Sequence, residues 1–448
     1  MDLVAALIYI LCLGILVLPV RFAYLVLISL AFFDASGPQF ASATSLGMAN
    51  AAKVLLAPTI LLVKLRGQPL FYFLHILKRS KLIWTFVFFA LFASLATLWS
   101  PDFLKLSAVK SVSYLWGYLL WFVVLLYGWV TSRIDVQLLY GIWGIGIFLG
   151  IVQTYLWGGP FSKGLHEEYL RFTAFSSPQS YAAFYTYWLA VALFSMRSVT
   201  LNSFVIHVIT LAVLALAGSR YSSLMAIWVV GVWLLYYLRS GFSSLNTVFL
   251  RFLLVAFLGL IIIIASPMLV AFLGNTRLAE LFERDISTIG TFAWRIGMWS
   301  EAWEQIEEFT LGEYIVGKGT AASALVALEY DLRYDPSTID ANRVMHNEFL
   351  KTFYEWGGIG LSLFLTFVLG LAFLGFKWLF EKQKRQEAFF LIAILGPLTS
   401  GLSIENILAG SGSPVGIGIA MALSYVHARV LGKYAYSKAP HPLPATGR

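Results

Sequence analysis

The sequence predicts an all-α membrane protein whose chain crosses the bilayer many times. Hydrophobic residues make up 59% of the 448 residues and charged residues only 12%, and the mean hydropathy is +0.80. These values lie outside the range of soluble domains. Many apolar stretches approach the roughly 20 residues that a helix needs to cross the bilayer, and they lack the short alternation of a membrane β-barrel. We therefore expect a polytopic helical bundle with 12 or 13 transmembrane helices.

The apolar stretches divide into thirteen candidate spans. The first two are joined only by Pro19-Val20-Arg21, so they form either a tight hairpin or one broken element. The chain starts with the acidic Met1-Asp2, where a signal peptide would be basic, and the first span is expected to be retained. The spans are 3–19, 22–33, 46–63, 82–99, 112–130, 137–157, 182–196, 203–217, 221–238, 252–273, 349–376, 388–404 and 412–430.

Lysine and arginine between the spans indicate the orientation of the chain. Residues 64–81, residues 377–387 and the C-terminal tail are rich in these cations, which favour the cytoplasmic side. Counting spans from these segments places residues 274–345 on the opposite, extracytoplasmic side. This segment holds twelve acidic and six basic residues, so the net charge of +8 comes from the inner face. The basic balance thus reflects topology, and no nucleic-acid partner is expected.

Four parts of the chain follow from this topology. Residues 1–273 are expected to form an N-terminal transmembrane bundle, and residues 274–345 a large extracytoplasmic loop. Residues 346–432 should form the C-terminal transmembrane helices, and residues 433–448 a disordered cytoplasmic tail. The one cysteine, Cys12, lies inside an apolar run, which excludes a structural disulfide.

The large loop contains a pattern typical of an amphipathic helix. In residues 292–309, Trp299, Trp303 and Ile306 recur with acidic residues at roughly helical spacing, and Arg295 lies one turn before Trp299. The loop ends at His346-Asn347, where apolar sequence resumes. These two residues should therefore stand at a helix N-terminus, which favours anions such as diphosphate.

Arg220 is the second unusual charge. It is the one formal charge between Arg197 and Arg239. Because a guanidinium at the bilayer edge costs a few kcal/mol, such a residue usually faces a polar cavity, although snorkelling to the interface is the alternative. Arg171 falls on the same side by the count of spans.

Several motifs in residues 165–375 resemble the O-antigen ligase and O-antigen polymerase superfamily of bacterial envelope polysaccharide assembly. They are Gly218-Ser219-Arg220 before a span, Arg295 with Trp299, Gly317-Lys318-Gly319, and His346-Asn347 followed by Glu355-Trp356-Gly357 and Gly360. The resemblance implies a metal-independent glycosyltransferase without a cofactor. Its donor would be a polyprenyl-diphosphate-linked glycan, and it would work on the periplasmic face of the inner membrane, with a cytoplasmic C-terminus.

The candidate residues suit this chemistry. Arginine can clamp a departing diphosphate through paired donors, and we assign that role to Arg220 and Arg295. Histidine titrates near neutrality, so His346 is our candidate for the base that deprotonates the acceptor hydroxyl. Asn347 either orients His346 or caps the helix. Further candidates for substrate binding are Arg171, Lys318 and Arg343, and Glu355 is a candidate that could instead brace the bundle.

Two classes of function are compatible with these features. The first is glycosyl transfer, either polymerisation of repeat units, which is slightly favoured, or ligation of a finished glycan to lipid A core. The second is transport, for example by a flippase for lipid-linked oligosaccharides. Candidate residues gather on one face of the membrane, which favours the enzyme. Expected partners are the donor, a glycan or lipid-glycan acceptor, the lipid bilayer, and chain-length regulator or flippase proteins.

Overall fold

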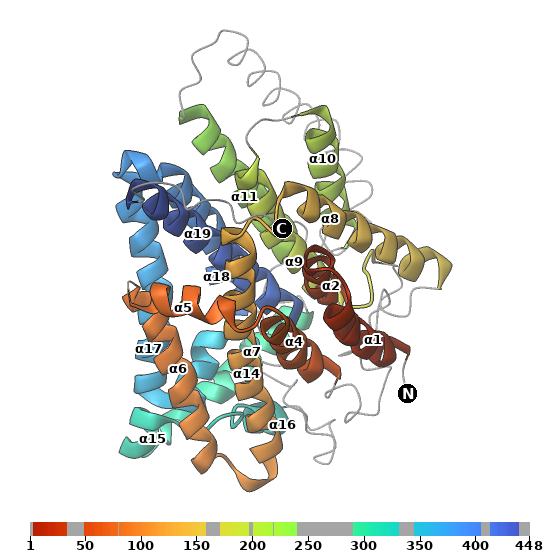
Figure 1. Cartoon of the computed structure of the whole chain (residues 1–448). Helices are drawn as coiled ribbons and strands as arrows, with labels where there is room; N and C mark the ends of the chain where they lie inside the picture. Colours follow the sequence, from red (N-terminus) through yellow and green to blue (C-terminus); the bar gives the residue numbers. More distant parts are fainter. Residues whose placement is uncertain are drawn as a thin grey trace.

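The computed structural model describes residues 3–33, 49–78, 80–157, 171–196, 200–217, 219–239, 290–330, 345–404 and 413–438. Within these residues the chain is helical, and the only β-type pairing is an isolated bridge between Phe33 and Phe175. The helices form one elongated bundle (Figure 1). This architecture confirms the predicted all-α membrane fold.

The helices follow one another along the chain with short connections. In the N-terminal half they are α1 (Leu3–Val17), α2 (Val20–Ser29), η1 (Leu30–Phe32), the π-helical η2 (Ala52–Leu56), α4 (Ala57–Lys64), α5 (Gln68–Leu77), α6 (Lys81–Leu95), η3 (Ala96–Trp99), η4 (Asp102–Leu104), α7 (Lys105–Val130), α8 (Val136–Ile151), the π-helical η5 (Val152–Leu156), α9 (Pro178–Ser195), α10 (Leu201–Leu216) and α11 (Arg220–Arg239). The remaining helices are α14 (Gly290–Glu307), α15 (Leu311–Val316), α16 (Ala324–Tyr330), α17 (Glu348–Leu379), η8 (Lys382–Lys384), α18 (Arg385–Ile404) and α19 (Ser413–Lys438).

Six helical segments of the described chain are long and apolar enough to cross a membrane. A seventh is the bent pair formed by residues 49–64 and α5, whose axes meet at 107°. The predicted number of 12 or 13 spans stays a prediction, because residues 252–273 lie outside the described residues. The six segments are Lys81–Trp99, Asp102–Val130, Val136–Leu156, Tyr221–Arg239, Glu348–Leu379 and Pro414–Leu431.

Helix α9 lies at the centre of the bundle. Every residue from Ser180 to Phe194 is buried, and the helix packs against α11, α18 and α19. Its tyrosine and tryptophan side chains satisfy their polar atoms on neighbouring backbones; Trp188, for example, donates to the Leu139 carbonyl at 3.0 Å. An apolar centre with satisfied polar tips is what burial of large aromatic residues requires.

Two boundaries differ from the sequence prediction. The first two spans are separate helices that meet at Pro19, which precedes the first residue of α2. At the other end, α19 continues to Lys438, so residues 433–438 are helical and not part of a disordered tail. The physical reason is that no proline or other strong helix breaker occurs after Gly432 until Pro440.

Candidate active site at one end of the bundle

Helices α14, α15 and α16, here called the loop helices, form a small folded unit at one end of the bundle. In Figure 1, α15 and α16 lie at the lower end of the molecule, beside the lower part of α17. On α14 the residues Met298, Ala302 and Ile306 are buried at four-residue spacing, and they share a core with Val326 of α16. This confirms the amphipathic helix predicted in the large loop.

The same core includes the start of α17. Met345, Leu350 and Tyr354 pack in it, and Trp299 of α14 lies against it. Trp303, by contrast, is 54% exposed. The buried stripe of α14 therefore faces protein, and the loop helices are fixed directly to the first turns of α17.

Helix α17 is interrupted at Gly357, which adopts φ 58° and ψ −160°. A break of this kind removes the helical hydrogen-bond partners of carbonyls one turn earlier. Residues 317–319, here called the strap, replace them. The Lys318 N–H donates to the Tyr354 carbonyl at 3.0 Å, and the Gly319 N–H donates to the Glu355 carbonyl at 2.9 Å. The strap thus completes the hydrogen bonding of the broken helix.

Glycine is required at this crossing because the backbones touch. Gly317, Gly319 and Gly357 all have positive φ. A Cβ atom on Gly357 would lie 2.5 Å from the Ile315 carbonyl oxygen, and one on Gly319 would lie 2.7 Å from the backbone of Ser100. No other residue type fits both the conformation and the space. The Gly-Lys-Gly signal found in the sequence therefore has a structural cause.

The strap also joins the end of α6. Thr320 donates its hydroxyl to the Ala93 carbonyl at 2.7 Å, and Ser100 donates its hydroxyl to the Thr320 carbonyl at 2.8 Å. Trp356 donates from Nε1 to the Thr320 hydroxyl at 2.8 Å. Three chain segments far apart in the sequence are consequently locked together beside the candidate site.

His346 lies between two anchored neighbours. Met345 is fully buried, and its carbonyl accepts the Trp299 Nε1–H at 2.5 Å. Asn347 caps α17, because its side-chain oxygen accepts the N–H groups of Phe349 and Leu350 at 3.1 Å each. Between them His346 adopts φ 49°, a conformation that L-residues seldom take and that recurs at functional sites. The imidazole is partly exposed. Its position is therefore set by the backbone on both sides.

Arg295 belongs to the same neighbourhood. It lies on α14, four residues before the tryptophan that holds the Met345 carbonyl. One helical turn, about 6 Å, therefore separates Arg295 from the contact next to His346 along the helix axis. Its side chain is partly buried. The predicted pairing of Arg295 with His346 at one end of the bundle agrees with this arrangement.

Arg171 and Arg220 are brought together by a second contact. The N–H of Phe172 donates to the Leu216 carbonyl at 3.1 Å, which places the buried Arg171 beside the connection from α10 to α11. Arg220 is the first residue of α11, and its side chain lies outside the described residues. The Ser219 hydroxyl accepts the Ser222 N–H at 3.3 Å, an N-cap contact that fixes the start of α11.

The remaining predicted residues have definite environments. The Lys318 ammonium lies over the rings of Phe309 and Tyr354, 4.8 and 5.4 Å from their centroids, so aromatic faces stabilise its charge. Glu355 is fully buried and accepts a hydrogen bond from the Ser323 hydroxyl. Of the two roles expected for Asn347, the capping role is observed. Arg343 lies outside the described residues.

The sequence interpretation missed a row of buried charges on α17. Glu348 and Lys351 are 0% and 2% exposed, and the Lys351 ammonium lies 3.6 Å from a Glu348 carboxylate oxygen. Glu355 follows on the same face, because the spacings of three and seven residues bring these positions onto one side of a helix. That spacing was the available signal. The structure shows that this face of α17 is covered by protein and not by lipid or water.

The protein is thus a helical membrane protein whose loop helices fold onto the start of one long helix and carry polar candidate residues there. Residues 205–365 match the family model described as O-Antigen ligase. The match contains Arg220, Arg295 and the whole strap and α17 crossing, and it confirms the resemblance to the O-antigen ligase and polymerase superfamily. No curated protein matches the chain.

Proposed function

We propose that the protein is a glycosyltransferase of cell-surface polysaccharide assembly that uses a polyprenyl-diphosphate-linked glycan as donor. The acceptor is a sugar hydroxyl, and transfer takes place on the extracytoplasmic face of the inner membrane. The observation that carries the proposal is the setting of His346. It is held in a left-handed conformation between two anchored residues, beside the helix that bears Arg295, within the matched family segment.

The proposed reaction breaks one bond and forms one bond. The acceptor oxygen attacks C1 of the donor sugar, and the bond from C1 to the diphosphate oxygen breaks. His346 accepts the acceptor's hydroxyl proton, for which an imidazole that titrates near neutrality is suited. Arg220 and Arg295 neutralise the charge that develops on the departing diphosphate, because guanidinium groups bind phosphate through paired donors. Arg171 and Arg343 are proposed as further contacts to the donor.

Polymerisation of repeat units is our preferred form of this reaction, and ligation to lipid A core is the alternative. Incubation of the purified protein with a polyprenyl-diphosphate oligosaccharide distinguishes them. A ladder of products from the donor alone indicates polymerisation, whereas a single shift of an added lipid acceptor indicates ligation. Movement of the donor across vesicle membranes without a new glycosidic bond would instead support a flippase and contradict the proposal.

Variants of the candidate residues test the assigned roles. His346→Ala should lower turnover by roughly 10²- to 10⁴-fold, the usual contribution of a positioned base. Arg295→Lys keeps the charge but loses paired donation, so turnover should fall less than in Arg295→Ala. His75→Ala changes an exposed histidine on α5 and serves as the control. Full turnover of His346→Ala at an unchanged protein level would show that the base is another group.

A chelation experiment tests the expected independence from metal ions. Turnover of the purified protein should be unchanged after exhaustive treatment with a strong chelator, because arginine side chains would supply the charge stabilisation. Loss of turnover that returns with an added divalent cation would overturn this part of the proposal.

A further inference from the structure

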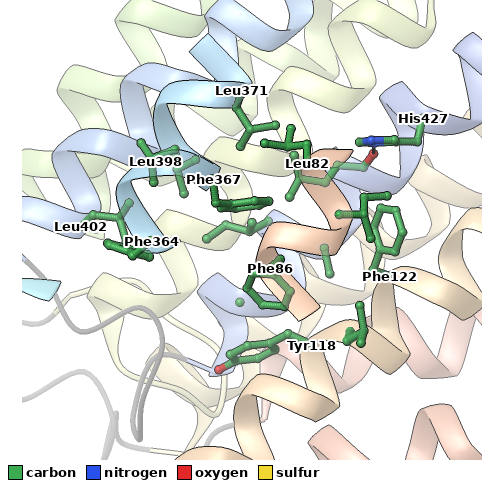
Figure 2. Close-up of a pocket in the computed structure, with 17 residues that line it drawn as sticks. Leu82, Phe86, Tyr118, Phe122, Phe364, Phe367, Leu371, Leu398, Leu402 and His427 are labelled. Atoms are coloured by element: carbon green, nitrogen blue, oxygen red, sulfur yellow. Dashed lines mark hydrogen bonds between the residues drawn. The ribbon is translucent and has the colours of Figure 1, made fainter. Parts of the chain in front are cut away.

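An elongated apolar cavity lies inside the bundle, away from the candidate active site. It is enclosed by α6, α7, α17, α18 and α19, and the space between its lining side chains is about 780 Å³. Figure 2 shows its walls, with Phe86, Phe367 and Leu398 between the ends and with Tyr118 and His427 far apart along it. The lining is almost entirely hydrocarbon. Its natural occupant is therefore a hydrocarbon chain and not a polar molecule.

The cavity is closed on the side of the candidate active site. Phe364 forms this end and is 3% exposed. Its ring packs against Phe89 at 5.4 Å and Phe349 at 5.5 Å between centroids, and Phe89 packs against Trp356 at 5.0 Å. A layer of buried aromatic rings thus separates the cavity from the strap and from His346. A chain bound in the cavity must enter from elsewhere.

The opposite end of the cavity is its accessible end. Leu82 at the start of α6 and His427 near the end of α19 are both partly exposed, whereas Leu402 and Gly416 at the other end are buried. From Gly416 to His427 the lining of α19 extends over about 16 Å of helix. This length is close to half of the roughly 30 Å hydrocarbon core, the depth of one leaflet. The cavity therefore matches one acyl chain that enters from the leaflet away from the candidate site.

Basic residues stand at this accessible end. Lys81 directly precedes Leu82, and Lys78 lies one turn earlier; both side chains are exposed, and neither forms an ion pair within the part of the chain that the structure describes. The chain from residue 65 to residue 82 contains no acidic residue. The neighbouring α5 exposes Phe71 at 72% and is bent 107° from the preceding helix. Exposed apolar and basic side chains together suit the headgroup region of an anionic leaflet.

From these observations we propose that the protein holds one anionic glycerophospholipid of the leaflet opposite the candidate active site. One acyl chain occupies the apolar cavity, and the phosphate lies at Lys78 and Lys81. This site is separate from the proposed glycosyl transfer and does not depend on it. Its ligand would stabilise the contact of α6 with α7 and α19, since the chain fills the space between them.

Native mass spectrometry of the delipidated full-length protein can test the site. Phosphatidylglycerol and phosphatidylcholine with identical acyl chains are titrated separately. Phosphatidylglycerol should bind about tenfold more tightly, because each lysine near a membrane surface contributes on the order of a few-fold in affinity for an anionic headgroup. Equal binding of the two lipids by the unaltered protein would refute the assigned headgroup contact.

Two variants separate the headgroup from the chain. The double variant Lys78→Gln/Lys81→Gln should weaken phosphatidylglycerol binding about tenfold and leave phosphatidylcholine unchanged. Ala420→Leu fills the cavity and should weaken both lipids about tenfold. Arg239→Gln, an exposed cation at the end of α11, is the control. Folding is checked by the thermal unfolding midpoint without added lipid. If folded Ala420→Leu bound both lipids normally, the cavity would not hold the chain; if it failed to fold, the lysine variant would still decide the headgroup contact.

Discussion

The two parts of α17 on either side of Gly357 follow opposite rules. Before the break, Glu348, Lys351 and Glu355 are buried. After it, Phe373 and Phe376 are 71% and 58% exposed, although they are large and apolar. In water this distribution would be highly unfavourable for both parts. It is reasonable only if the second part faces lipid and the first part is surrounded by protein.

The difference teaches that one helix can serve two environments when its backbone is broken between them. The loop helices and the strap cover the first part and supply its polar partners, whereas the second part needs only neighbouring helices and lipid tails. Candidate residues gather at the first part because a protein-covered, polar setting can position charged groups. An apolar span in lipid offers no such setting.

Removal of Lys351 should give the largest loss of stability. Lys351→Ala leaves the carboxylates of Glu348 and Glu355 buried without the intervening ammonium, which should cost about 3–5 kcal/mol in the free energy of unfolding. Phe373→Ala, at an exposed position in the second part, should change stability by less than about 0.5 kcal/mol. Thermal unfolding midpoints in one detergent compare the two variants.

A double variant sharpens this prediction. Lys351→Met combined with Glu348→Gln removes both charges of the pair, so it should recover part of the stability that Lys351→Met alone loses. Equal midpoints for Lys351→Ala and Phe373→Ala would mean that the first part of α17 is not a special environment, and the comparison between the two parts would fail.

Substitution at the break should have an intermediate effect. Gly357→Ala places a Cβ 2.5 Å from the Ile315 carbonyl oxygen at a positive φ, so it should destabilise the protein by about 1–3 kcal/mol and separate the strap from α17. Gly358→Ala is the matched control, since its Cβ meets no atom closer than 3.4 Å. Hydrogen exchange at the amides of Lys318 and Gly319 measures the separation. Full protection in Gly357→Ala would contradict the role given to the strap.

The smallest effect should occur at α15, on the outer side of the strap. Thr310 and Glu313 form a capping box, in which the Thr310 N–H donates to the Glu313 carboxylate at 2.8 Å. This backbone hydrogen bond, followed by the one from the Thr310 hydroxyl, lowers the pKa of Glu313 below its usual value. Thr310→Ala should destabilise α15 by about 1 kcal/mol.

The sign of the pH dependence follows from the lowered pKa of Glu313. The ionised carboxylate stabilises α15 fully above its unfolded-state pKa, and the contribution is lost as the pH falls through the lower folded-state pKa. Hydrogen exchange of residues 311–316, corrected for the intrinsic rate at each pH, should therefore show protection that decreases in acid. Glu313→Gln retains a capping amide without the charge, so its protection should not vary over this range. An acid-induced loss in that variant would point to another group.

The sequence was sufficient to predict much of this fold. Composition and apolar length predicted the helical membrane bundle, and the spacing of residues 292–309 predicted α14. The position of His346 at the start of a helix was also correct, since Asn347 caps α17. These features depend on local periodicity and on helix-end chemistry, which a sequence displays directly.

The crossing of the strap with α17 could not be predicted. Its hydrogen bonds join Lys318 and Gly319 to residues 36 positions later, at Tyr354 and Glu355. No local pattern specifies such a pairing. The buried charges were missed for a related reason: a charge near the end of an apolar span normally reaches the headgroups, and only the covering loop helices change that outcome.

The break at Gly357 also has a consequence for biosynthesis. The segment from Gly358 to Leu379 is 22 residues long and spans about 33 Å as a helix, enough to cross a bilayer by itself. The nine residues from Glu348 to Trp356 carry three ionisable groups, each of which resists entry into lipid by about 2.5–3.5 kcal/mol at mid-membrane depth. The insertion machinery should therefore release only the later segment into lipid. The first turns of α17 would then fold last, when the strap reaches them.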